Sequence, residues 1–346
     1  MAVEVFKNLF KQSQESGYFS FKKLSQELSI LSPKSREKQG VSYNDTEQKI
    51  IAETKAAIVK NFCLNSAIMN TDKFNISILN GFMELLDDET NSEKNLAQSF
   101  FLLHASKSDF SNIKCSKDII INILKNLWSI DTNVDQEEYS EYHSMFQTLI
   151  KSKNIIKNIT NVMNELIEEI NKPLYNYSNL KLIFFNSDFD TLCGFSGKDR
   201  IYINTLPFTK ISQYRCFSSE VKEIALKLEF VRLFIHETSH VVLRYYLGNL
   251  NLSSPYLKNE SNYKIKKSVI ECGIESEKKI FQEVIDWDRS IDNRYNLTYC
   301  KKFLNDILSD KFEIFDTEKA EVVLIPPEDI PKVTFSIRFH EKLRGF

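Results

Sequence analysis

One long apolar segment, residues 219–248, constrains the fold of this chain more than any other feature. Ser218 and Ser219 are good helix N-cap residues, Glu220 places negative charge in the first turn, and Gly248 suits the position after the last turn. The segment carries apolar side chains nearly all round its axis: Leu226, Leu228, Phe230, Val231, Leu233, Phe234, Ile235, Val241, Val242 and Leu243. A helix that is apolar all round is buried, so we expect the rest of the fold to pack around it.

Two histidines and a glutamate interrupt this helix, in the order His236-Glu237-Thr238-Ser239-His240. At about 100° per residue, His236 and His240 project from the same face, one turn apart. Imidazoles at that spacing can hold one Zn²⁺ between them, each through one ring nitrogen at roughly 2.0–2.1 Å. Glu237 would lie beside the metal and take a proton from zinc-bound water, whose pKa the metal lowers to about 7. This H-E-x-x-H pattern predicts two metal ligands and a general base.

The alternative is a buried helix with two hydrogen-bonded histidines and a glutamate at its edge. The chain has five histidines, so a chance H-E-x-x-H is rare, on the order of one such sequence in a few hundred. Three titratable groups in an apolar helix are also costly unless they are paired or bind a metal. Both points favour a metal site.

The next predicted helix, residues 267–287, offers three carboxylates as a third ligand: Glu271, Glu275 and Glu277. Glu277 falls at the centre of the apolar stripe of this helix, where an unpaired charge would cost several kcal/mol. We therefore predict Glu277 as the third ligand and Glu271 as the second choice. Glu271 or Glu275 could instead accept a hydrogen bond from a ligand histidine. The alternative is three solvated glutamates on an exposed helix; Gly273 on the same face favours a close helix contact.

These motifs resemble those of the zincin metallopeptidases of the gluzincin type, which include thermolysin-like enzymes and the clostridial neurotoxin light chains. The segment from Glu277 to Phe281 resembles the third-ligand segment of the light chains, and Glu271 to Glu277 resembles an E-x-G-x-x-x-E pattern of gluzincin-like proteins from microbial eukaryotes. The resemblance covers residues 180–290. It departs from the light chains at Gln282, where the family has Gly, and in lacking an Arg-x-x-Tyr pair.

The resemblance implies an α+β fold with a zincin-like catalytic domain, in which a small mixed sheet accompanies the zinc-binding helices. It implies one zinc per chain, a polypeptide substrate, and a metalloendopeptidase that hydrolyses peptide bonds with water activated by Glu237. The strand around Ile201, or segment 191–196, would pair with extended substrate; a plain core hairpin is the alternative. A catalytically lapsed zincin-fold scaffold and a host-directed effector protease with one narrow target are the other hypotheses.

Peptide hydrolysis also needs a donor to the developing oxyanion, besides the metal. Tyr295, Tyr299 and His340 are candidates, and each is equally compatible with a structural role. Arg244 lies one turn beyond His240, and we expect its long side chain to extend to the surface rather than to bind a carboxylate or substrate.

The remaining chain divides at Pro173, where helical patterns give way to strand patterns. Residues 1–172 predict an α-helical region without a functional signal, and residues 173–346 the catalytic domain. Helices are expected at 46–62, 72–86, 92–106, 116–128 and 138–170, the last broken near 151–153, and at 301–311. Strands are expected at 180–185, 200–204, 320–325 and 333–339.

Composition excludes several classes of protein. Lys+Arg 45 against Asp+Glu 47 gives a net charge of −2, which offers no electrostatic reason to expect nucleic acid as a partner. Six scattered cysteines without a C-x-x-C pair are typical of reduced thiols. Without a signal peptide or an apolar run of transmembrane length, we expect a cytoplasmic or intracellular location; export by a route that needs no signal peptide stays open. No oligomeric state follows from the sequence.

Overall fold

The computed structural model describes residues 43–64, 91–107, 123, 126–127, 129–187, 192–252 and 271–326. The chain divides into two compact units, residues 1–130 and 131–346. The division falls before the boundary expected at Pro173, because two helices that precede Pro173 pack into the core of the second unit.

The described part of the first unit contains two packed helices, α3 (Asp45–Leu64) and α6 (Ser92–Ala105). The Asn91 side chain caps α6 by accepting from two backbone N–H groups of its first turn. The Asn61 side-chain amide donates to Ser106 Oγ at 2.9 Å and so joins α3 to the end of α6. Both helices match the predicted ranges; the helix predicted at 72–86 lies outside the described residues, as does most of that at 116–128.

A three-stranded sheet lies in the second unit, with the order β1-β3-β2. Strand β1 (Lys181–Phe185) is parallel to β3 (Arg200–Asn204), with Lys181 opposite Arg200; β2 (Gly194–Ser196) is antiparallel to β3, with Phe195 opposite Tyr202. Strands β1 and β3 were predicted, whereas β2 was not among the predicted strands; it lies within segment 191–196, one of the two segments expected to pair with extended substrate. Because β3 is paired on both sides, the strand around Ile201 has no free edge for an extended chain.

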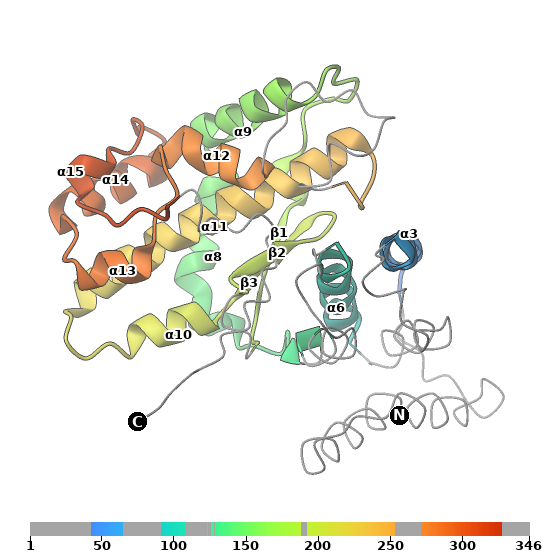
Figure 1. Ribbon diagram of the computed structural model, residues 1–346, viewed down its shortest axis with the longest axis horizontal. Helices are drawn as coiled ribbons and strands as arrows, with labels where there is room; N and C mark the ends of the chain where they lie inside the picture. Colours follow the sequence, from blue (N-terminus) through green and yellow to red (C-terminus); the bar gives the residue numbers. More distant parts are fainter. Residues whose placement is uncertain are drawn as a thin grey trace, which may run out of the picture. The chain divides into compact units, whose positions relative to one another are not determined.

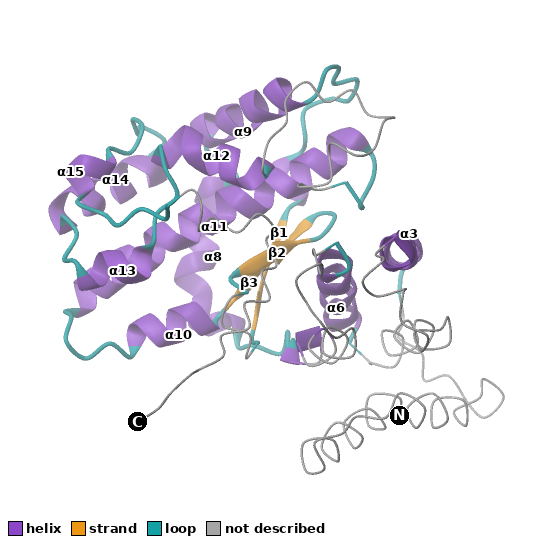
Figure 2. Ribbon diagram, viewed as in Figure 1, coloured by secondary structure: helices purple, strands orange, loops and turns teal. Residues whose placement is uncertain are grey.

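Helices make up most of the second unit (Figure 2). In chain order they are α8 (Ser140–Leu149), α9 (Lys153–Leu166), α10 (Leu206–Ser212), α11 (Ser219–Leu247), α12 (Cys272–Phe281), α13 (Trp287–Asp292), α14 (Leu297–Leu308) and α15 (Thr317–Ala320), with short 3₁₀ turns at Gln136–Tyr139 and Tyr177–Asn179. The predicted break near 151–153 separates α8 from α9, where Ser152 caps α9 by accepting from the Ile155 N–H. The strand predicted at 320–325 is reduced to one bridge between Leu324 and Ile285; that at 333–339 lies outside the described residues.

Helix α11 is the axis of this unit. Its ends follow the prediction: Ser218 accepts from the Val221 N–H, and Gly248 has φ 67° and donates to the carbonyls of Arg244 and Tyr245. Such a left-handed residue is the usual end of a helix that terminates in glycine. In Figure 1, α11 crosses the unit with α9 and α12 on one side and the strands on the other, and it contacts α9, α12, β2 and β3. The predicted α+β class is therefore confirmed.

None of the described helices, α11 included, combines the length and the apolar character that crossing a bilayer requires.

Helices α11 and α12 come close together at Gly273. A Cβ atom added there would lie 2.6 Å from His236 Nδ1 and 2.7 Å from Cγ and Cε1 of the same ring. The buried imidazole has little room to withdraw, so only a residue without a side chain fits. The close approach predicted for this glycine is confirmed.

Replacing Gly273 with alanine should destabilise the metal-free protein by roughly 1–2 kcal/mol. Overpacking a core costs about 1–3 kcal/mol, which exceeds the gain of about 0.5–1 kcal/mol from removing a helical glycine. The measurement is urea unfolding of G273A against S276A, a control on the same helix whose buried hydroxyl has no hydrogen-bond partner among the described residues. S276A should be nearly neutral. Equal stabilities of G273A and the wild type would contradict the close contact.

Candidate metal centre

Three buried side chains converge between α11 and the start of α12: His236, His240 and Glu271. The two histidines lie one turn apart on α11, and Glu271 is the extended residue immediately before α12, with φ −161° and ψ 138°. One ligand atom from each residue lies within 4.8 Å of the others. The cluster could therefore hold a metal ion, as the sequence motif predicts for the two histidines.

The spacing of these atoms can be compared with that around a tetrahedral ion. His236 Nε2 lies 3.4 Å from His240 Nε2 and 3.3 Å from Glu271 Oε1, and His240 Nε2 lies 2.9 Å from the same oxygen. Ligands at roughly 2.0–2.1 Å from a tetrahedral ion are about 3.3–3.4 Å apart. The three atoms therefore nearly form one face of a tetrahedron, and the residues fit a small divalent cation.

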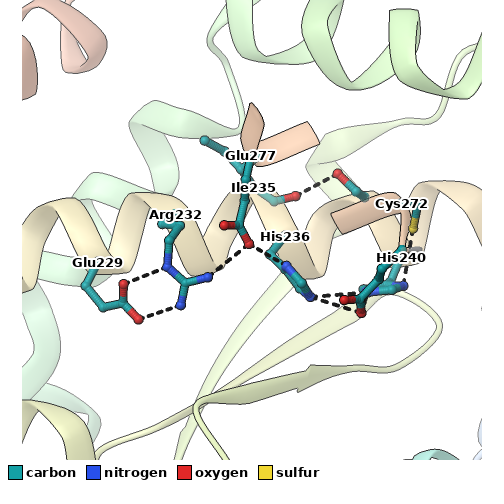
Figure 3. A network of polar contacts seen from close by, with 9 residues as sticks. Glu229, Arg232, Ile235, His236, His240, Cys272 and Glu277 are labelled. Carbon is teal, nitrogen blue, oxygen red and sulfur yellow. Dashed lines mark hydrogen bonds and ion pairs between the residues drawn. The ribbon is translucent and has the colours of Figure 1, made fainter. Parts of the chain in front are cut away.

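The opposite nitrogen of each ring is also engaged (Figure 3). His236 Nδ1 lies 2.5 Å from Glu277 Oε1, and His240 Nδ1 lies 3.3 Å from Cys272 Sγ. Ligating histidines commonly donate their second N–H to a neighbouring acceptor, which fixes the ring and its tautomer. Both Nε2 atoms are thereby turned toward Glu271.

Glu277, the predicted third ligand, occupies a different place. It contacts the far edge of the His236 ring and accepts from Arg232 Nη1 at 2.9 Å. A buried carboxylate does need a cation or donor, and Arg232 meets that need. We predicted a helix from residue 267, but α12 begins at Cys272 and Glu271 has an extended backbone. The direction of the Glu271 side chain therefore does not follow the helical periodicity on which the prediction was based. The geometry therefore favours the second choice, Glu271, as the third ligand.

Two effects set the pKa values of the clustered side chains: their burial and the ion pairs between the imidazoles and the carboxylates. Burial lowers the pKa of His236, but the carboxylates of Glu271 and Glu277 outweigh this effect and raise it well above its ordinary value. Burial lowers the pKa of His240 to about 4, against the opposing effect of Glu271. Burial raises the pKa of Glu271, but the two imidazoles outweigh it, so the net shift is downward. The Glu271 carboxylate is thus ionised, which is the form that binds a cation.

Glu237, the predicted general base, lies between the cluster and β2. Burial raises its pKa to about 7, although a hydrogen bond with the Ser196 side chain opposes this. A Cβ at Gly194 would lie 3.4 Å from Glu237 Oε1, so the strand passes close to the carboxylate. Arg244 holds the strand there: its Nη1 donates to Ser196 O at 2.7 Å and Gly197 O at 3.1 Å. The predicted surface position of Arg244 is wrong, because the side chain is buried.

The other site candidates lie elsewhere. Tyr295 donates to the Val221 carbonyl in the first turn of α11, and the Tyr299 hydroxyl accepts from the Asp316 N–H. Glu275 is half-buried on α12 and is not among the three clustered residues, and His340 lies outside the described residues. Arg232 and Glu229 were not predicted as part of the site, although the sequence held a signal: they lie four and seven residues before His236 and are the charged residues of the otherwise apolar stretch 228–235.

Comparisons with known proteins give a different indication from the motif. No protein-family model matches the chain, and no solved structure matches it. The chain is similar to the CRISPR-associated endoribonuclease Cas13a of Leptotrichia shahii, with 22% identity over 301 residues, covering 78% of this chain and 20% of that protein. The chain thus spans about a fifth of the length of the curated relative that it matches.

This similarity overturns the expected relationship to zincin metallopeptidases. The relative is named as an RNA-cleaving enzyme, so the predictions of a gluzincin-type peptidase, a polypeptide substrate and no nucleic acid are wrong. The lapsed zincin scaffold and the effector protease were variants of the same assignment and fall with it. The physical reason is that H-E-x-x-H specifies two imidazoles on one helix face and a carboxylate beside them. That arrangement determines how a metal is held, and it carries no information about the bond that is broken.

The two candidate ligands can be separated by metal affinity, with zinc as the probe. Glu271→Gln should lose most zinc binding, because it replaces the one carboxylate among the three proposed ligands with a neutral amide. Glu277→Gln should weaken zinc binding by about 10–100-fold, the usual effect of removing an outer partner of a ligand histidine. Chelator competition measures both, with the exposed Glu283→Gln as the control. The assignment fails if Glu277→Gln loses zinc and Glu271→Gln retains it.

Proposed function

We propose that this protein is a metal-dependent hydrolase that cleaves RNA phosphodiester bonds. The observation that carries the hydrolase is the near-tetrahedral face formed by His236, His240 and Glu271, with the Glu237 carboxylate next to it in sequence and buried beside it. The similarity to an endoribonuclease supports RNA as the substrate class.

Zinc is the ion that this donor set suits best, at one per chain. Two imidazole nitrogens and one carboxylate oxygen are typical of catalytic zinc sites, which keep a fourth position open. When bound there, the ion supplies a Lewis acid that lowers the pKa of a water and polarises a phosphoryl oxygen.

Glu237 is the group that moves the proton. Its carboxylate takes a proton from the attacking water, whose oxygen forms a new bond to phosphorus. The bond from phosphorus to one ribose oxygen breaks, and that oxygen receives the proton held by Glu237. Burial raises the pKa of Glu237 above that of a free carboxyl group, which favours its acceptance of the proton and lets it release the same proton to the leaving oxygen.

RNA binding must depend on local groups near the site. The net charge of −2 gives the whole protein no attractive field for a polyanion. Lysine and arginine side chains that contact phosphates directly would then supply the affinity, which should fall with added salt.

Glu237→Gln should lower the rate of RNA cleavage by about 10²–10⁴-fold, because the amide cannot accept the proton. Zinc content should stay that of the wild type, since Glu237 is not one of the ligands. The measurement is the appearance of fragments from end-labelled RNA with the zinc-loaded full chain. Chelation should abolish cleavage and added zinc restore it, and Glu283→Gln is the matched control.

Two results would contradict this proposal at different points. Cleavage by Glu237→Gln at the wild-type rate would remove Glu237 from the reaction. Failure of the zinc-loaded wild type to cleave any RNA would reject RNA as the substrate. The zinc-affinity measurements would still test, independently, whether His236, His240 and Glu271 bind a metal.

A further inference from the structure

A chain of ion pairs extends from the proposed metal centre along α11. Arg232 Nε and Nη2 donate to the two oxygens of Glu229 at 2.7 and 2.6 Å, and Arg232 Nη1 donates to Glu277 Oε1 at 2.9 Å. Figure 3 shows these contacts continuing to His236. All four groups are largely buried, so each contact is shielded from water.

The guanidinium of Arg232 is held in one orientation. Its two-point contact with Glu229 uses the planar, fork-like geometry that arginine offers to a carboxylate. The remaining nitrogen, Nη1, is thereby directed at Glu277, which lies 45 residues after Arg232 and on another helix.

One oxygen of Glu277 makes all of the hydrogen bonds and ion pairs of this carboxylate among the described residues. Oε1 accepts from Arg232 Nη1 and lies 2.5 Å from His236 Nδ1, whereas Oε2 is buried and has no hydrogen-bond partner among the described residues. Arg232 is therefore what fixes the carboxylate apart from the histidine itself. Because an ionised carboxylate only accepts, Nδ1 of His236 carries a hydrogen. Nε2, the nitrogen that faces His240 and Glu271, is therefore the one that would lose its proton and bind a metal.

We infer that Arg232 is a positioning residue for the metal centre, acting through Glu277 to fix the tautomer and orientation of His236. The inference rests on the metal centre of the proposed function and is independent of RNA as the substrate. Glu229 contributes to the same positioning, since its two contacts hold the Arg232 guanidinium in place.

Zinc affinity tests this inference without any substrate. Arg232→Gln should bind zinc about 10–100-fold more weakly than the wild type in chelator competition, the usual effect of removing an outer partner of a ligand histidine. Arg232→Lys should recover little of the loss, because one ammonium group cannot contact Glu229 at two points and reach Glu277 as well. Arg289→Gln, which removes a 70% exposed arginine side chain, is the control and should bind like the wild type.

A double-mutant cycle identifies the route of the effect. Arg232→Gln should cause little further loss in a Glu277→Gln background, because the two residues act through one contact. Wild-type affinity in Arg232→Gln, full recovery in Arg232→Lys, or losses that multiply in the double variant would each overturn the inference.

Folding and metal binding are separated by two further measurements. If circular dichroism shows that Arg232→Gln does not fold, Glu229→Gln serves instead; it should weaken zinc binding, and wild-type affinity there would overturn the inference. A wild-type chain that binds no zinc would refute the proposed metal centre itself, a result distinct from zinc binding that is insensitive to Arg232.

Discussion

The site depends on the contact between α11 and α12 at Gly273, where the two helices approach so closely that an added methyl group would touch the His236 ring. A buried helix with two histidines and two glutamates near its centre is costly on its own, since each polar group loses its hydration. Helix α12 and the residue before it offset this cost by supplying partners: Glu271 lies at one edge of the His236 ring and Glu277 at the other. One helix contact thus brings both carboxylates to His236: Glu271, the proposed third ligand, and Glu277, the proposed orienting group.

The opposite side of α11 is covered by the edge strand β2, and a second buried arginine secures it. Arg244 donates to the backbone at the end of this short strand, whose Ser196 side chain is hydrogen-bonded to Glu237. Arg232 and Arg244 therefore have parallel places in the structure. Arg232 contacts Glu277, which contacts the proposed ligand His236. Arg244 contacts the strand that lies beside the proposed general base, Glu237.

Much of the framework could be predicted because its signals are local. The ends of α11 follow from Ser218 and Gly248, and the pattern of β1 and β3 is carried by a few consecutive residues. The sequence could not place Glu271 ahead of Glu277 beside the two histidines, because the choice depends on where α12 begins: a helix starting at Cys272 rather than at residue 267 changes the direction of the Glu271 side chain. Strand β2 is only three residues long and adjoins a turn, so it left no periodic pattern. The substrate class was predicted wrongly because the motif specifies how a metal is held, whereas the similarity that corrects it is spread over 301 residues.

X-ray absorption at the zinc edge of the zinc-loaded wild type tests the central claim most directly, because it reports the atoms bound to the ion. The account predicts nitrogen and oxygen neighbours at roughly 2.0–2.1 Å, with the outer-shell scattering of two imidazoles and no sulfur. The alternative is a site in which Cys272 is a ligand, since its Sγ lies 3.3 Å from His240 Nδ1. A zinc–sulfur distance of about 2.3 Å, or scattering from fewer than two imidazoles, would contradict the ligand set of His236, His240 and Glu271.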